Sequence, residues 1–207
     1  EPIHVSVAPQ SKDTNMGHIK NVMFSNIIAE CESGIVVHGW KDRPIQGLVL
    51  DNIKLRITES PINDIYGGNF DLRPTHVMEK ALFKHDIPGI YCGMVDGLRI
   101  QNVELEWEDN MHEFFSHGIE CENFNNLIID GFNGRQPHKS GNGAAISLSN
   151  GSNVTIRNCI AAEGTQTFLT FSGIKNQRLF VNNDLSNAAT VMQPAKSEFK
   201  LFGNYIP

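Results

Sequence analysis

Ile19-Lys-Asn-Val-Met-Phe-Ser-Asn-Ile27 decides the fold, because similar nine-residue stretches recur along the chain. In each stretch an apolar pair flanks one variable residue, and Asn or Gly follows two positions after the pair. The six copies are IKNVMFSNI (19–27), IQGLVLDNI (45–53), VDGLRIQNV (95–103), FNNLIIDGF (124–132), GSNVTIRNC (151–159) and NQRLFVNND (176–184). A repeat of this period is typical of a stacked solenoid.

The apolar residues inside each copy alternate, which predicts β-strands with one face turned inward. The predicted inward pairs are Val22 and Phe24, Leu48 and Leu50, Leu98 and Ile100, Leu127 and Ile129, Val154 and Ile156, and Leu179 and Val181. A second strand precedes most copies. Its predicted inward pairs are Ile35 and Val37, Ile90 and Cys92, Ile119 and Cys121, Ile146 and Leu148, and Leu169 and Phe171.

Each repeat therefore predicts a strand, a tight bend, a second strand and a loop. Stacked repeats of this kind predict an all-β chain, a right-handed single-stranded parallel β-helix with about six to seven rungs, spaced about 4.8 Å apart. The recurring Asn is expected at the bend, where Asn tolerates left-handed backbone geometry and can hydrogen-bond the next copy. The Asn or Gly positions are Asn26, Asn52, Asn102, Gly131, Asn158 and Asn183.

The repeats run almost end to end, so we predict one domain over residues 1–207. The step from Asn52 to Asn102 is 50 residues, which represents either two rungs or one rung with a long insertion. The pattern is missing from about 58–88, and a loop this long inside a regular solenoid is usually either functional or disordered. A polar loop at 134–143 either reaches a ligand or is plain surface. Residues 188–207 lose the repeat and are expected to cap the open end of the fold.

Composition narrows the function classes. The formal net charge is −6 and there is no basic cluster, which argues against nucleic acid and anionic membranes as partners. No apolar run approaches the ~20 residues of a membrane span. The four cysteines show no metal-ligand spacing, so we predict no metal and no cofactor. Cys92 and Cys121 are expected to be buried free thiols, with a disulfide as the alternative.

Several stretches resemble the polygalacturonase-like glycoside hydrolases, family 28 of the pectin-degrading β-helix enzymes. They are 19–27, Gly34-Ile-Val-Val37, Pro2-Ile-His-Val-Ser-Val7, His85-Asp-Ile-Pro-Gly-Ile-Tyr91 and Ile129-Asp-Gly-Phe-Asn-Gly-Arg-Gln136. The last two are similar to a divergent bacterial branch of the family. The resemblance covers nearly the whole chain. It implies a secreted or periplasmic enzyme that acts on pectin-like, uronate-containing polysaccharides with inversion of configuration.

The chain differs from this family in the motifs that carry the family's catalytic residues. The family's catalytic residues sit in Asn-Thr-Asp, Asp-Asp and Gly-His-Gly motifs, followed by Arg-Ile-Lys, and this sequence has none of the four. Gly17-His18 is followed by Ile19, and Arg56-Ile57 by Thr58. We therefore interpret the chain as the C-terminal part of such an enzyme, assign no catalytic residue, and expect the chain alone to be inactive. Its start at Glu1 and not at Met also indicates an upstream segment.

In the resembling family, substrate lies along the sheet that holds the first strand of each rung. The outward positions on that sheet are predicted to be Val36, His38, Tyr91, Glu120, Ser147 and Thr170, with Glu122 as a further candidate. Trp can stack on a sugar ring, and Arg can pair with a uronate carboxylate. The predicted substrate-binding residues are Trp40, Arg43, Tyr91, Arg73, His38 and Glu120, and His85 could close over the same groove.

Each of these candidates has a structural alternative. Trp40 could pack under the bend, Arg43 could pair with a surface carboxylate, and Glu120 could be an ordinary solvated strand residue. Glu104 and Glu106 alternate with inward residues, which favours a solvated strand face over a catalytic carboxylate pair.

Two function classes remain open, and a purely structural solenoid is the third reading if neither binding nor cleavage appears. One is the hydrolase fragment, with a polysaccharide or oligosaccharide as partner. The other is a non-catalytic glycan-binding module of the adhesin or tailspike kind. In either case an exposed first rung leaves a free strand edge, which favours end-to-end self-association.

Overall fold

The computed structural model describes residues 1–9, 11, 13, 15–72, 82–138, 141, 143–195 and 199–207, without the side chains of residues 66 and 82. Its elements are β1 (His4–Ser6), β2 (Met23–Cys31), β3 (Ile35–His38), β4 (Ile45–Gln46), β5 (Val49–Ile57), α1 (Asn63–Tyr66), β6 (Asn69–Asp71), β7 (Leu82–Lys84), β8 (Ile90–Asp96), β9 (Arg99–Trp107), β10 (Ile119–Asp130), β11 (Asn133–Gly134), β12 (Ala144–Ser149), β13 (Ser152–Arg157), β14 (Ile160–Ala161), β15 (Thr165–Ser172), β16 (Lys175–Val181), β17 (Ala188–Gln193) and β18 (Lys200–Phe202). The all-β prediction is confirmed.

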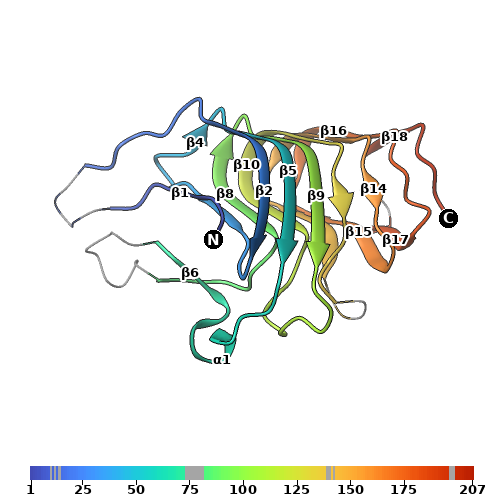
Figure 1. Ribbon diagram of the computed structural model, residues 1–207. Coiled ribbons are helices and arrows are strands. Elements are labelled where there is room, and N and C mark those ends of the chain that lie inside the picture. Colours follow the sequence, from blue (N-terminus) through green and yellow to red (C-terminus); the bar gives the residue numbers. More distant parts are fainter. Residues whose placement is uncertain are drawn as a thin grey trace.

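Parallel pairing organises the strands into one large sheet of 16 strands (Figure 1). One run of neighbours follows the order β1, β3, β8, β10, β12, β15 and β17. A second run places β2 beside β5 and β5 beside β9. Each strand thus pairs with the strand that follows one pass of the chain later. The two termini lie at opposite ends of the stack in Figure 1.

The pairing of β5 with β9 decides between the two readings of the 50-residue step. Leu50 and Ile53 lie opposite Ile100 and Val103, so no additional pass separates these strands. α1, β6 and β7 belong to the excursion between them. β6 and β7 form a separate antiparallel pair at the β1 end of the molecule (Figure 1).

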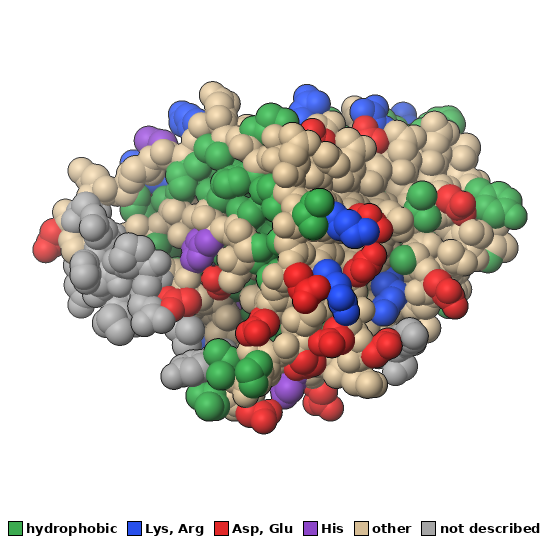
Figure 2. All heavy atoms as spheres, viewed as in Figure 1, with side chains coloured by type: hydrophobic (Ala, Val, Ile, Leu, Met, Phe, Trp, Pro, Cys, Tyr) green, Lys and Arg blue, Asp and Glu red, His purple; other side chains and the backbone are tan. Residues whose placement is uncertain are grey.

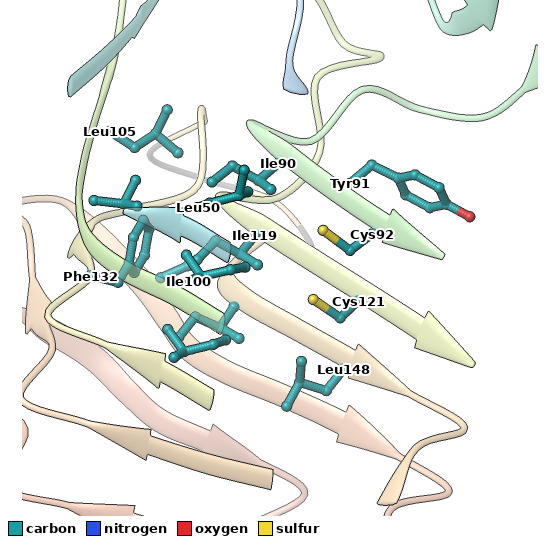
Figure 3. Close-up of a cluster of buried hydrophobic side chains, with 14 of the residues drawn as sticks. Leu50, Ile90, Tyr91, Cys92, Ile100, Leu105, Ile119, Cys121, Phe132 and Leu148 are labelled. Atoms are coloured by element: carbon teal, nitrogen blue, oxygen red, sulfur yellow. The ribbon is translucent and has the colours of Figure 1, made fainter. Parts of the chain in front are cut away.

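The predicted inward residues form the core. Ile35, Ile90, Ile119 and Ile146 occupy partner positions on β3, β8, β10 and β12, and all are buried. Cys92 and Cys121 are likewise partners, buried and free, with their sulfur atoms on adjacent strands (Figure 3). Their hydrogen bond, together with burial, raises the pKa of Cys121.

The predicted left-handed bends are confirmed for most copies. Asn26, Asn52, Asn102 and Asn158 have φ values between 52° and 57°, and Gly131 takes the equivalent place with φ 73°. Asn52 Nδ2 donates to Asn26 Oδ1 at 2.7 Å, which is the expected bond between stacked copies. Asn102 instead donates to the Asp51 carboxylate at 3.1 Å, so neighbouring acidic residues share this role.

In the sixth copy, the inward residues are shifted by one position from those predicted from the sequence. The register shifts after Ser152, so that Phe180 lies opposite Ile156, and Phe180 is buried where Leu179 and Val181 had been predicted inward. Asn182 adopts the left-handed bend. Asn183 is buried, and its Oδ1 accepts a 2.9 Å hydrogen bond from the Cys159 amide. The cause is one additional residue in β16, as in a β-bulge.

Residues after 187 continue the sheet. Leu169 on β15 lies opposite Met192 on β17, and Leu179 on β16 lies opposite Lys200 on β18. The single domain and the capping role of this segment remain predictions.

Candidate functional site

The predicted outward positions line up across the sheet in two columns. The first column contains His4, Val36, Tyr91, Glu120, Ser147, Thr170 and Gln193. The second contains Ser6, His38, Gly93, Glu122, Ser149 and Ser172. Tyr91 points to the opposite side of the sheet from the core side chains around Cys92 and Cys121 (Figure 3). Strand alternation therefore collects the candidate residues on one face.

The β6–β7 hairpin covers one end of this outward face. Phe70 lies 5.6 Å from Tyr91 between ring centroids, and Phe83 lies 5.3 Å from Tyr91 and 4.8 Å from His38. Val36, Tyr91 and Phe70 are fully buried as a result. Two residues predicted to contact sugar, Tyr91 and His38, are thus packed under the hairpin, and their substrate-binding role remains a prediction.

Burial under these rings also changes His38. Burial, with smaller contributions from the nearby His4 and His85, lowers the pKa of His38 to about 4. Among the described residues, its buried Nδ1 atom has no hydrogen-bond partner. His38 is therefore a neutral ring in the aromatic layer at neutral pH.

Tyr91 and Glu122 form the first polar pair of the site. The Tyr91 hydroxyl donates to Glu122 Oε1 at 2.5 Å. The phenol lies over Gly93, where a Cβ atom would be 2.4 Å from the hydroxyl oxygen. Burial and then this hydrogen bond raise the pKa of Tyr91, so the phenol remains a donor. A donor held in this way fixes the orientation of the Glu122 carboxylate.

His85 and Glu120 form the second pair. His85 Nε2 lies 3.4 Å from Glu120 Oε1, and Nδ1 lies 2.5 Å from the Asp86 carbonyl oxygen. Burial alone would lower the pKa of His85, but the bonds to Glu120 and to the Asp86 carbonyl and the charges of Glu120 and Glu122 outweigh it, so the pKa is raised. His85 therefore binds its proton more tightly here than a solvated histidine would.

A pocket of ≈ 520 Å³ lies beside these pairs. Asp86, Glu113, His117 and His138 line it with Ser116. The Ala144 amide donates to His117 Nδ1 at 3.0 Å, which leaves His117 Nε2 as the protonated nitrogen of the neutral ring. Burial lowers the pKa of His117, and Glu120, His85 and Asp86 all act on it electrostatically. The pocket is near the His85–Glu120 pair, because the lining residue Asp86 directly follows His85 in the chain.

Part of the polar loop at 134–143 lies against this pocket, and its contact with a ligand remains a prediction. His138, Gly141 and Gly143 from that loop line the pocket. His138 Nε2 and Ser116 Oγ are buried without a hydrogen-bond partner among the described residues. The loop thus reaches a cavity instead of forming only outer surface.

The remaining predicted substrate-binding residues lie elsewhere or outside the described residues. Trp40 and Arg43 exchange two backbone hydrogen bonds across a tight turn, and Trp40 packs partly against the core. Arg43 Nη1 donates to the Asp42 carbonyl at 2.8 Å. Arg73 lies outside the described residues. These contacts do not test the predicted sugar-binding roles of Trp40 and Arg43.

Glu104 and Glu106 lie on the face formed by β2, β5 and β9. Lys54 Nζ lies 3.3 Å from Glu104 and 3.7 Å from Glu106, and all three side chains are about half exposed. Acidic and basic side chains lie side by side on this face (Figure 2). The contacts favour the solvated strand face over a catalytic pair.

Sequence reasoning missed Asp86 and His117 and treated His85 only as a covering residue. Both missed residues lie in the segment that leads into an inward strand, Asp86 four residues before β8 and His117 two residues before β10. In the described part of the chain, no group of three or more His, Cys, Asp or Glu residues is arranged to hold a metal. No helix among the described residues is long and apolar enough to cross a membrane.

Comparison with known proteins shows a likeness of fold. No family model matches the chain, and no curated protein matches it. A crystal structure from Parabacteroides merdae ATCC 43184, described as a "putative glycosyl hydrolase", superposes with a TM-score of 0.50. The identity is 10%, and the match covers 92% of this chain and 83% of that one. At this identity the likeness shows the fold alone.

Proposed function

We propose that this chain is a glycoside hydrolase of the right-handed, single-stranded parallel β-helix class, and that Glu120 and Glu122 form its reaction centre. Parallel pairing of strands one pass apart supports the β-helix with about six to seven rungs. The observation that carries the function is the pair of carboxylates on one outward face, each with its own proton partner. The fold shared with the Parabacteroides merdae protein supports a carbohydrate substrate.

The spacing of the carboxylates suits inversion. Residues two apart on one strand face are separated by roughly 6.5–7 Å. Inverting hydrolases keep their two carboxyl groups about 6.5–9.5 Å apart, which leaves room for a water molecule. Glu120 and Glu122 are two apart on β10. A carboxylate pair that keeps this backbone spacing leaves room for an attacking water, so the proposal assigns inversion.

The partners divide the roles. Glu122 accepts the Tyr91 hydrogen bond and serves as the base that removes a proton from the attacking water. The His85–Glu120 pair holds a proton near Glu122 and delivers it to the departing glycosidic oxygen. Water attacks the anomeric carbon, the glycosidic C–O bond breaks, and the two protons end on Glu122 and the leaving group. Polar side chains of the adjacent pocket hold a sugar residue by its hydroxyl groups.

The resemblance to the polygalacturonase-like family, together with a bacterial source and secretion, is part of this proposal. Pectin-like glycans are the first substrates to test. The family's aspartate motifs are missing, so Glu120 and Glu122 take the place of those acids in the proposal.

A stereochemical experiment tests it. The protein is incubated with polygalacturonan, rhamnogalacturonan and arabinoxylan, and the first product anomer is followed by proton NMR. We expect cleavage of one of these glycans with inversion at the anomeric carbon. Retention of configuration contradicts the assigned roles of Glu120 and Glu122.

A glycan-binding module without catalysis is the second candidate, because the family's catalytic motifs are missing from the sequence. It predicts calorimetric binding of one of the same glycans without cleavage, weakened by Trp40→Ala. Binding by a protein that never releases reducing sugar favours this candidate over the hydrolase.

A further inference from the structure

The outward face differs sharply on the two sides of Glu120. On the β1 side, the next residues of the two columns are Tyr91 and Gly93, and beyond them Val36 and His38. Val36 and Tyr91 have no exposed surface, although they point away from the core. On the β17 side, the columns continue with the small hydroxyl residues Ser147, Ser149, Thr170 and Ser172, which are partly or fully exposed.

Described parts of the hairpin account for the closed side. Phe70 on β6 is fully buried between the hairpin and the sheet. The Phe83 ring lies 6.3 Å from Phe70 and 4.8 Å from His38, and the His85 ring lies 4.8 Å from Tyr91. Aromatic rings at these separations are packed in contact. A sugar residue therefore has no room over Tyr91 and Val36.

The reaction centre stands at this boundary. His85, which follows the hairpin strand β7, contacts Glu120, and the side chains of His85 and Glu120 are only 21% and 18% exposed. On the β17 side of Tyr91, Glu120 is thus the first outward residue of its column that the hairpin does not seal. A polysaccharide that lies along the columns can extend from Glu120 toward Ser147 and Thr170, but not past Tyr91.

From this we infer that the site receives glycan chain ends and removes sugars from a terminus, because the β6–β7 hairpin blocks passage of an internal segment. The inference rests on the proposed function and adds its mode of action. The open side offers Ser and Thr hydroxyls, which suit hydrogen bonds with successive sugars of a chain that leaves the site in one direction.

Two length-dependent measurements test this, using the glycan of the three named above that the protein binds. Affinity is measured by calorimetry per mole of chain, for an oligosaccharide long enough to reach from Glu120 past Thr170 and for polymers of increasing length. One terminus per chain predicts a dissociation constant that changes less than about twofold with length. Cleavage is expected to release small sugars from the start while the viscosity of the polymer falls slowly.

An affinity per chain that rises in proportion to length contradicts chain-end binding, as does an early collapse of viscosity. Failure of all three glycans to bind counts instead against the proposed function. Phe83→Ala weakens the packing of the hairpin on the sheet and is expected to increase the viscosity loss per bond cleaved. Phe202→Ala, at the other end of the sheet, is the control and is expected to keep the wild-type value of this ratio. Equal ratios for the two variants contradict the role of the hairpin.

Discussion

The Tyr91 hydroxyl donates to Glu122 Oε1 at 2.5 Å, although the two residues are 31 positions apart. Parallel pairing of β8 with β10 places Gly93 opposite Glu122, and the missing side chain at Gly93 gives the phenol its space. A buried donor is thereby fixed on a carboxylate at the edge of the covered face. This relationship links the packing of the hairpin to the chemistry proposed for Glu122.

Tyr91→Phe is expected to reduce the free energy of unfolding by about 1.5–3 kcal/mol, because a hydrogen bond to a charged group is lost while the ring remains. Urea denaturation at neutral pH measures the change. Tyr205→Phe, at a side chain that is 67% exposed, is the matched control and is expected to change stability by less than about 0.5 kcal/mol. Equal losses of unfolding free energy in the two variants would show that the Tyr91 hydroxyl stabilises the fold no more than an exposed hydroxyl does.

Gly93→Ala is expected to destabilise the protein by about 1–3 kcal/mol, since the new methyl group collides with a phenol that is held under the hairpin. Gly17→Ala, where the added Cβ has no neighbour within 4 Å, serves as the control. Thermal denaturation compares the two. A stable Gly93→Ala protein contradicts the fixed position of the Tyr91 ring.

Substitutions at Asn102 test the stacked bends. Its φ is 52°, and Gly131 fills the same place in the next copy. Asn102→Gly keeps the left-handed geometry and loses only the bond to Asp51. Asn102→Val adds a backbone cost of about 1–2 kcal/mol, because a side chain branched at Cβ disfavours this conformation. Chemical denaturation should therefore rank wild type above Gly and Gly above Val, and the reverse order for Gly and Val is incompatible with this account.

His38 makes stability depend on pH. Its pKa is about 4 in the folded protein and about 6.5 when unfolded, so the unfolded state binds the proton first as pH falls. Its stabilising contribution is present above pH 6.5 and declines between pH 6.5 and 4, by about 3 kcal/mol at most. The measurement is the difference in unfolding free energy between wild type and His38→Phe across this range. A difference that does not change with pH refutes the buried neutral ring.

His85 acts in the opposite direction. Its raised pKa means that the folded state holds the proton more tightly. Its contribution to stability is present below pH 6.5 and is lost as pH rises through the pKa of the folded protein. His85→Gln should therefore bring the unfolding free energy closer to that of wild type as the solution becomes more alkaline. A gap that widens with rising pH is the contrary result.

The repeat made the strands and their inward residues predictable because burial imposes a period of two on every pass. Ile35, Ile90, Ile119 and Ile146 follow from that period alone. The one-residue register shift in the sixth copy could not be predicted from the sequence. Residues 182 and 183 are both Asn, and either one fits the bend. Tertiary pairing, and not local preference, selects Asn182.

The site was less predictable than the strands. Outward positions such as Tyr91 and Glu120 followed from alternation, but their burial depends on Phe70 and Phe83 from an insertion without the repeat. His85 lies in the segment before β8, whereas Glu120 lies on β10. No local sequence spacing therefore predicts the contact between their side chains. Sequence periodicity places residues on a face and does not show what covers that face.

The rate of glycan hydrolysis by Glu122→Gln tests the central claim most directly. Reducing-sugar release from the cleaved glycan is compared for wild type, Glu122→Gln and the surface control Glu104→Gln. The account predicts a rate reduced by about 10²–10⁴-fold for Glu122→Gln and an unchanged rate for Glu104→Gln. A Glu122→Gln protein that folds and hydrolyses the glycan at the wild-type rate would contradict it.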